Sequence, residues 1–411
     1  MSKTSNRNNF KTLERTQIAN GVSIPTSQIS NIPEGVENVI SFYPSATAPS
    51  WGGNFVIDIK DTNMLIHNLS LIFNVSSISG TTGATNLRYN PAYFWVNHID
   101  LKLSGKVIDT YYPVEQFIAQ QLLYDDEDRI YSNNAAGHYA SVAQRTTLAS
   151  GTNNYIVKLF SIFDQCNLSI VNQNQTIQLV VYMEPLANCV VNNGTGTPVS
   201  TINSCQAIIK NTKLPVNVSE GISRSLNLGA RTIFHKLLYM QYTAQAGVSS
   251  FNAILNTFVG KLTTLIFVVR PSASTTGDNA FSFVPVSNFN ILDSTNNSLV
   301  GGTVIQSSVA LQYLNLYYFN SSYTIETATG SIDNVGTVVD NKANVYAWSF
   351  SNNTVDALLN GQLNSSKQFV GTEQLQIQFT SALGASHNID VFAFAESMCS
   401  QLPTGYEVNL L

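Results

Sequence analysis

Residues 344–395 decide the fold that the sequence predicts, and they read NVYAWSFSNNTVDALLNGQLNSSKQFVGTEQLQIQFTSALGASHNIDVFAFA. At 345–350, small side chains alternate with Tyr, Trp and Phe, and this two-residue period predicts a strand. One or two helical turns are expected over 354–361, because Thr354 suits an N-cap and Gly361 suits the residue after a helix.

Two further strands are expected in the same stretch. At 374–380, apolar side chains alternate with glutamines, so one face of the strand is apolar and the other is polar. After a turn at Gly384, residues 389–394 carry Ile, Val and two Phe side chains in strand-like order. The whole stretch therefore predicts strand, short helix, strand, turn and strand.

An earlier part of the chain repeats this pattern about 190 residues upstream. Each match alone is weak, but all of them keep the same order. The matched segments are 69–75 with 262–269, 96–102 with 286–292, 114–122 with 308–316, Phe160-Ser161 with Phe350-Ser351, and Gln178-Leu179 with Gln376-Ile377. Short strands at this density favour β-sandwiches, and eight-stranded sandwiches with long crossovers are typically jelly rolls. We therefore predict an all-β fold of two tandem eight-stranded jelly-roll β-sandwiches with short inserted helices.

The first half predicts strands, loops and one strong helix. On a long strand at 65–75, Leu65 and His67 are expected on the same face as Leu69 and Phe73. The best helix in the chain is expected at 113–123, where Pro113 suits the first helical position. The remaining expectations are strands at 55–59, 94–103, 155–163, 176–183 and 205–214, and loops at 76–86 and 133–154.

Three segments follow from this pattern. Residues 1–30 form a polar arm with Lys3, Arg7, Lys11 and Arg15 and no strand period; this is either a plain disordered terminus or an arm that orders on assembly. The first jelly roll is expected at 31–220 and the second at 221–411. The boundary is expected between 214 and 231, where the chain carries Pro215, Gly221 and Gly229.

The composition of the 411-residue chain restricts its function. Charged residues make up only 11%, against roughly 25% in typical soluble domains, and a surface poor in charge resembles a protein contact. A net charge of −5 argues against nucleic-acid binding by the jelly rolls. The first residues are polar and resemble no signal peptide, and no apolar run is long enough to cross a bilayer. The four cysteines lack CxxC spacing and are expected to be reduced, mostly buried thiols.

Motifs for catalysis or metal binding are not found, so we expect no enzyme, no catalytic, cofactor-binding or metal residues, and no cofactor. Gly260-Lys261 is not a complete P-loop. His98 and Asp100 share a strand face and could be two metal ligands, although an ordinary strand pair is favoured. His67 is expected to be a satisfied core or seam histidine. Asp125–Asp128 is interpreted as a solvated or interface cluster, with a calcium site as the alternative. Tyr317–Phe319 is interpreted as core aromatics, with a ligand platform as the alternative.

The tandem pattern resembles the double jelly-roll major capsid proteins of tailless icosahedral DNA viruses. Two stretches carry most of the resemblance: 369–380 together with 388–394, and 97–121. The polinton-like and virophage branch of these proteins is the most similar. The resemblance implies a major capsid protein, located in the virion and made inside the host cell, that forms pseudo-hexagonal homotrimeric capsomers of an icosahedral shell. A secreted carbohydrate-binding or adhesin-type tandem β-sandwich remains the alternative, because low charge and many aromatics suit it too.

The resemblance also implies partners. Each trimer would contact neighbouring capsomers, and penton and minor or cement capsid proteins would complete the shell. The polar basic arm at 1–30 is expected at the base of the capsomer, where a contact with an internal membrane stays open.

Overall fold

The computed structural model describes residues 36–61, 63–82, 85–88, 91–123, 126–137, 142–165, 169–170, 176–192, 194–227, 231–272, 283–300, 345–351, 366–402 and 405–410. Several sequence predictions lie outside this set. They are the arm at 1–30, the helices at 308–316 and 354–361, and the aromatic cluster 317–319.

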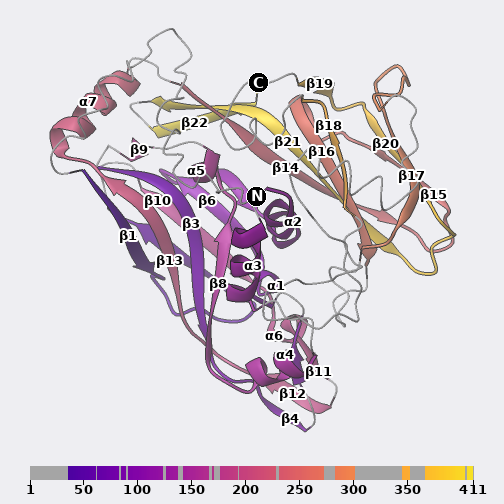
Figure 1. Ribbon diagram of the computed structural model, residues 1–411, viewed down its shortest axis with the longest axis horizontal. Helices are drawn as coiled ribbons and strands as arrows, with labels where there is room; N and C mark the ends of the chain where they lie inside the picture. Colours follow the sequence, from indigo (N-terminus) through magenta and orange to yellow (C-terminus); the bar gives the residue numbers. More distant parts are fainter. Residues whose placement is uncertain are drawn as a thin grey trace, which may run out of the picture.

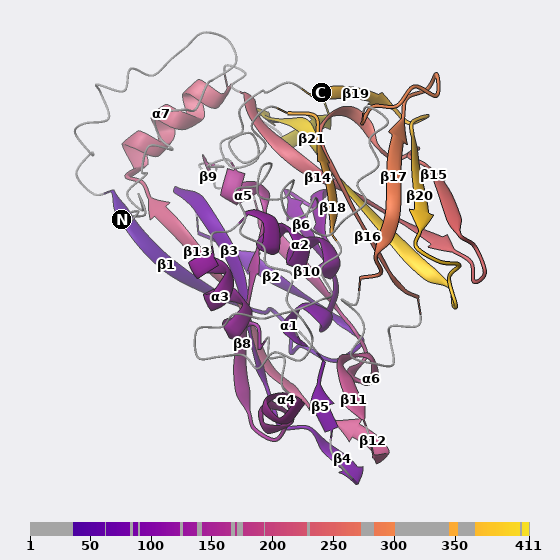
Figure 2. The same ribbon diagram turned by 45° about the vertical axis from the view of Figure 1, so that its right-hand side comes forward.

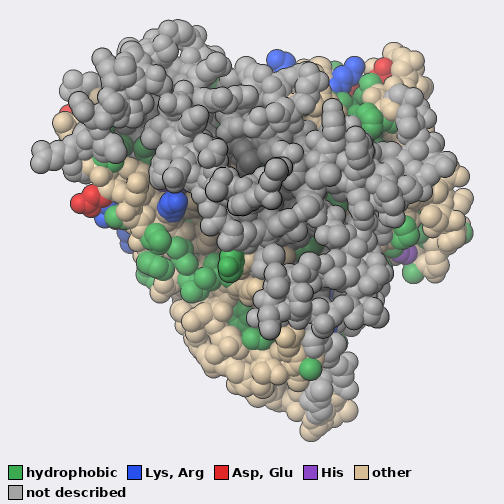
Figure 3. Space-filling model, viewed as in Figure 1, with side chains coloured by type: hydrophobic (Ala, Val, Ile, Leu, Met, Phe, Trp, Pro, Cys, Tyr) green, Lys and Arg blue, Asp and Glu red, His purple; other side chains and the backbone are tan. Residues whose placement is uncertain are grey.

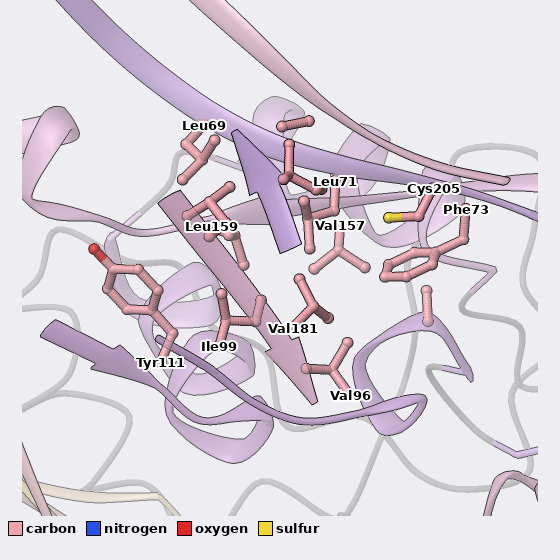
Figure 4. Packing of buried hydrophobic residues seen from close by; sticks show 14 of the residues in the cluster. Leu69, Leu71, Phe73, Val96, Ile99, Tyr111, Val157, Leu159, Val181 and Cys205 are labelled. Atoms are coloured by element: carbon pink, nitrogen blue, oxygen red, sulfur yellow. The ribbon is translucent and has the colours of Figure 1, made fainter. Parts of the chain in front are cut away.

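The first half of the chain folds into two facing sheets (Figure 1). One sheet has the order β1 (Glu37–Pro44), β13 (Ile202–Lys213), β3 (Met64–Val75) and β8 (Asn153–Leu159), with β9 (Ser169–Ile170) also paired to β3. The other has the order β2 (Asn54–Ile59), β10 (Ile177–Met183), β6 (Val96–Leu103) and β7 (Lys106–Tyr111). Figure 4 shows the core between them, where Leu71 and Val157 of one sheet face Ile99 and Val181 of the other.

The second half repeats this arrangement. One sheet has the order β14 (Arg231–Ala244), β21 (His387–Leu402), β16 (Val259–Pro271) and β18 (Tyr346–Ser349), with β19 (Lys367–Val370) also paired to β16 and β22 (Gly405–Leu410) also paired to β21. The other has the order β15 (Ser250–Ile254), β20 (Gln374–Phe379) and β17 (Val286–Leu292). Its core is a separate cluster that includes Leu265, Phe289 and Ile377.

The strand orders of the two halves correspond element by element. The order β1-β13-β3-β8 matches β14-β21-β16-β18, and β2-β10-β6 matches β15-β20-β17. The segments matched in the sequence fall on these equivalent strands: 69–75 and 262–269 lie on β3 and β16, and Gln178-Leu179 and Gln376-Ile377 lie on β10 and β20. The predicted double jelly roll is confirmed. We refer to the two halves as roll 1 and roll 2.

The strongest predicted helix is present as α2 (Pro113–Leu123). In Figures 1 and 2 it lies between the two rolls. The other described helices are α1 (Pro91–Phe94), α3 (Asp126–Ala135), α4 (Val142–Ala149), α5 (Ile162–Gln165), α6 (Leu186–Cys189) and α7 (Val216–Asn227). None of these described helices combines the length and apolarity needed to cross a membrane.

Two loop predictions and one strand end were wrong. The segment 133–154 contains the end of α3 and the whole of α4, and the polar residues that suggested a loop lie on short helices. The strand expected to reach residue 163 ends at Leu159, and α5 follows. The loop 76–86 contains β4 (Ser79–Thr82) and β5 (Thr85–Leu87), which pair with β12 (Thr195–Val199) and β11 (Val190–Asn192). The segment 214–231, where the boundary between the two rolls is predicted, carries helix α7.

The predicted face of the long strand was also wrong at its start. Met64 and Ile66 are buried on β3, whereas Leu65 and His67 are only half-buried. The cause is a β-bulge: Lys210 pairs with Asn68 and Asn211 pairs with Ile66, so His67 is an extra residue on β3. Because one inserted residue reverses the side-chain alternation, the pattern before the bulge shifts by one position.

Candidate assembly interface

The titratable residues singled out in the sequence have structural partners. His98 stacks on Tyr182 with ring centroids 4.1 Å apart, and Asp100 accepts a hydrogen bond from Thr110 Oγ1 at 2.8 Å. His67 lies 2.6 Å from Thr212 Oγ1, on the outer side of its strand. Among the described residues, no group of three or more His, Cys, Asp or Glu side chains could hold a metal ion. The side chains of Asp125–Asp128 lie outside the described set.

The thiols of Cys189 and Cys205 and the imidazoles of His235 and His387 are buried. Cys189 and Cys205 are free, and burial raises the pKa of each thiol well above its usual value. Burial lowers the pKa of His235 to about 4, so its imidazole is neutral at physiological pH. These groups are packing elements of the two rolls, and the surfaces of the rolls become the candidate for function.

The contact between the two rolls is apolar at its centre, and we call it the seam. Helix α2 of roll 1 packs on the outer face of the β14-β21-β16-β18 sheet of roll 2. Phe160 of roll 1 meets Phe394 edge to face with ring centroids 6.0 Å apart. The seam cluster consists of Val114, Phe117, Ile118, Ala119, Phe160, Ile266, Val268, Phe283, Val345, Ala347, Phe392 and Phe394. Large apolar residues from segments far apart in sequence are therefore removed from water together.

Hydrogen bonds fix the position of α2 in the seam. The Gln116 side chain accepts from the Phe160 backbone N–H at 2.6 Å and donates to the Phe160 carbonyl at 3.1 Å. Its Nε2 also donates to Glu115 Oε1 at 3.2 Å. Because all three residues are buried, each bond satisfies a polar group that water cannot reach.

A charged network lies on the roll 2 side. Asp390 is fully buried and accepts from Arg270 Nε, from Tyr239 Oη at 2.6 Å and from Gln241 Nε2 at 2.7 Å. Across the seam, the rings of Tyr239 and Tyr112 have centroids 4.6 Å apart. The network therefore places a satisfied ion pair beside the contact between the rolls.

Two acidic residues of roll 1 are buried beside the seam. Burial raises the pKa of Asp109 to about 7, against which Lys236 of roll 2 acts in the opposite direction. Burial, and then the nearby charge of Asp109, raises the pKa of Glu115 well above its usual range. The Glu115 side chain lines a small cavity whose other walls are apolar: Ile118, Ala119, Leu237, Ile266, Phe392 and Phe394.

The equivalent sheet of roll 1 has an outer face with exposed apolar side chains. Ile40 is 63% exposed and Phe42 is 58% exposed, both on β1. Phe42 pairs with Ile208 of β13, and Ile72 of β3 pairs with Ile156 of β8. In Figure 3, hydrophobic side chains gather on the part of the surface that β1 and β13 occupy in Figure 1. We call these five residues the open stripe.

The sequence matches no protein-family model and no curated protein. Comparison of the folds, in contrast, gives close matches. The VP54 protein of PBCV-1, from a crystal structure fitted into a reconstruction of the virophage Sputnik, has a TM-score of 0.65 at 13% identity, over 91% of this chain and 97% of its own. The Faustovirus major capsid protein has a TM-score of 0.60 at 8% identity, over 88% and 90% of the two chains. The mavirus major capsid protein has a TM-score of 0.52 at 12% identity, over 100% and 95%.

The chain has the double jelly-roll capsid fold. The resemblance predicted from the sequence is confirmed at the level of fold, and virophage proteins are among the matches. At these sequence identities the likeness shows only the fold. The seam and the open stripe are the features from which a role can be inferred.

The open stripe was not predicted from the sequence, because the earliest strand of the first jelly roll was expected at 55–59. Residues 37–44 read ENVISFYP, and the structure places all eight on β1. The sequence did contain the pattern of a strand with two apolar faces. Ile40 and Phe42 lie two positions apart on one face, and Val39 and Tyr43 lie on the other. A strand that is apolar on both faces is expected to have both faces covered.

Proposed function

We propose that this protein is the major capsid protein of an icosahedral DNA virus and that it assembles as a homotrimeric, pseudo-hexagonal capsomer. The observation that carries the proposal is the difference between two equivalent sheet faces. The outer face of the roll 2 sheet is buried by α2, whereas the same face of the roll 1 sheet exposes Ile40 and Phe42. Exposed contiguous apolar residues of this size mark an interaction surface.

The seam supplies a template for the missing contact. It is heterologous, because roll 1 contributes its helix flank and roll 2 contributes its sheet face. Each chain therefore retains one unused sheet face, on roll 1, and one unused flank, on roll 2. If a second copy repeats the seam at the open stripe, the head-to-tail contact propagates from copy to copy. With two similar rolls per chain, closure after three copies gives a six-sided ring.

The charge distribution favours this assembly. Charged residues make up 11% of the chain. On the outer face of β1, β13, β3 and β8, Lys210 pairs with Ile40 and Lys158 lies in the same row as Phe42 and Ile208. Burying such a face desolvates few ions, which removes the main penalty of a polar interface. Stable interfaces of permanent assemblies bury upwards of about 2,000 Å², and a whole sheet face with its rim can supply an area of this order.

The test is the mass of the native full-length protein, measured by native mass spectrometry and light scattering. We expect a trimer for the wild type. Phe42→Lys should give monomers with an unchanged circular dichroism spectrum, because the added charge would be desolvated only at the contact between copies.

Val199→Lys is the matched control, since Val199 is 55% exposed on β12, outside the open stripe. This variant should remain trimeric. A wild-type monomer at micromolar concentration, or trimers of Phe42→Lys equal in stability to those of Val199→Lys, would contradict the proposal.

Further parts of the proposal concern the whole particle. The division into a 1–30 arm, a 31–220 roll and a 221–411 roll places the boundary near α7. The capsomer would contact its neighbours, pentons and minor capsid proteins in a virion assembled inside the host cell, and the arm would order at the base. Deletion of residues 1–30 should then spare trimers and impair shells. The fold comparison does not favour the carbohydrate-binding or adhesin alternative.

A further inference from the structure

We propose that Glu115 is a proton-controlled lock between the two jelly rolls: the neutral acid lets α2 seat on roll 2, and the ionised acid loosens the seam. The starting observation is position. Glu115 is 2% exposed, at the point where α2 meets the roll 2 sheet. Its side chain lines a cavity whose other walls are aliphatic and aromatic side chains from both rolls.

The hydrogen bonds of Glu115 do not compensate a buried negative charge. Within the described residues, its two oxygens accept from Gln116 Nε2 at 3.2 Å and from the Tyr112 backbone N–H at 3.4 Å. Both donors belong to its own helix or to the residue before it, and neither is cationic. An ionised carboxylate in such surroundings is strongly disfavoured, so the proton is retained.

The charges around the seam give the same answer. Roll 1 contributes two acids, Asp109 and Glu115, and roll 2 contributes Asp390. The cations that act on them are both from roll 2: Arg270 is bound to Asp390, and Lys236 acts on Asp109. Asp390 and Asp109 therefore each have a cation that acts on them. Glu115 is the acid with no cation against it.

The other titratable groups near Glu115 do not supply a positive charge. Tyr111 and Tyr112 lie beside it on roll 1, and Tyr239 faces it from β14 of roll 2. Burial raises the pKa of each of these three phenols, so they stay neutral. Asp164 on α5 acts on Tyr111 and adds negative charge on the roll 1 side.

The sign of the pH effect follows from linkage. An acid whose pKa is higher in the folded chain than in the unfolded chain holds a proton that the unfolded chain has released. Glu115 rises above its usual 4.5, and Asp109 rises from 3.8 to about 7. The stability contributed by both acids is therefore complete below about pH 4 and is lost as the pH rises through the window up to their folded pKa values.

The experiment measures thermal unfolding of the full chain between pH 5 and pH 8.5 for the wild type and Glu115→Gln. Glutamine keeps the shape and the neutral state, so the variant should lose less stability with rising pH. One unit of pKa elevation corresponds to a shift on the order of 2 °C in Tm for a chain of this length. Glu37→Gln is the matched control, since Glu37 is exposed at the start of β1; it should follow the wild type.

A second readout detects the proton directly. The infrared difference spectrum between the wild type and Glu115→Gln at pH 7 should contain the C=O stretch of the protonated Glu115 side chain, because any band from Asp109 is common to both proteins and cancels. The lock is refuted if Glu115→Gln keeps the wild-type pH dependence, or if the spectra of the two proteins agree in this band. Both measurements work on monomers as well as trimers, so a failed capsomer and a failed lock are distinguishable. If Glu115→Gln does not fold, the infrared titration of Asp109→Asn decides whether a buried carboxyl other than Asp109 is protonated at pH 7.

Discussion

The outer faces of two equivalent sheets differ although their strand orders are the same. In roll 2, Tyr239 pairs with Phe392, Phe392 with Ile266, and Ile266 with Ala347, which makes one apolar row across four strands. In roll 1, the corresponding rows alternate. Phe42 and Ile208 are followed by Ser70 and Lys158, and in the next row Pro44 and Gln206 are followed by Ile72 and Ile156.

This difference indicates when each face is covered. The roll 2 face is buried as soon as the chain folds, because α2 belongs to the same chain, and a continuous apolar row carries no penalty there. The roll 1 face contacts water until another copy arrives. Interspersed Ser, Gln and Lys keep such a face soluble while leaving apolar residues for the contact.

The largest effect is expected in the centre of the seam. Phe394 is 1% exposed and packs on Phe160, so Phe394→Ala should lower the free energy of unfolding by about 3–5 kcal/mol. Urea unfolding followed by far-UV circular dichroism measures this change. Phe42→Ala is the control on the open face; below the concentration at which copies associate, it should change the value by less than about 0.5 kcal/mol. Equal losses for the two variants would remove the distinction between the faces.

The buried ion pair beside the seam gives the next largest effect. Asp390→Asn removes the charge that Arg270 and Tyr239 contact, so a buried guanidinium loses its counterion. Breaking such a pair is expected to cost about 3 kcal/mol in unfolding free energy. Glu37→Gln, at an exposed acid on the open side, is the control and should be near neutral. A stability of Asp390→Asn equal to that of Glu37→Gln would show that the network contributes nothing.

A smaller loss is expected for the hydrogen bonds that hold α2. Gln116→Leu leaves the buried Phe160 N–H without its acceptor at 2.6 Å, which should cost about 1–3 kcal/mol. In this variant, the rate of hydrogen exchange at the Phe160 amide should increase more, relative to the wild type, than the exchange rates of amides in the core of roll 1. Gln206→Leu, on the open face between Pro44 and Ile72, is the matched change and should leave that amide unaffected. If the Phe160 amide exchanges equally fast in both variants, the Gln116 bond does not fix α2.

Much of the fold follows from local pattern, and particular residues show where pattern stops. Strands such as 374–379 were predictable because their alternation is complete, and α2 was predictable from Pro113 and its spacing. The bulge at His67 was not, because an inserted residue is defined by the partner strand β13, which lies about 140 residues away in sequence. Helix α4 was hidden by polar residues whose helical state depends on packing.

The candidate assembly interface was less predictable than the fold. Glu115 and Gln116 look like ordinary helix residues in the sequence, and their burial comes from a roll formed mainly by residues more than 100 positions later. The open stripe requires register: Phe42 and Ile208 are neighbours only because β1 pairs with β13. Sequence pattern indicates which side chains are apolar, whereas long-range pairing decides which of them form one surface.

The smallest effect on folding is predicted for the open stripe itself. Ile40 is 63% exposed, so its methyl groups gain almost no burial when a single chain folds. In the Phe42→Lys background, where copies stay apart, the further change Ile40→Thr should alter the unfolding free energy by less than about 0.5 kcal/mol. In the otherwise wild-type chain, Ile40→Thr should instead weaken the trimer, because apolar area that a second copy would cover is lost. Urea unfolding of the monomeric pair and dilution-dependent light scattering of the assembling pair separate the two effects. A loss of unfolding free energy without any loss of association would mean that Ile40 serves the fold of roll 1 and that the open stripe is not a contact between copies.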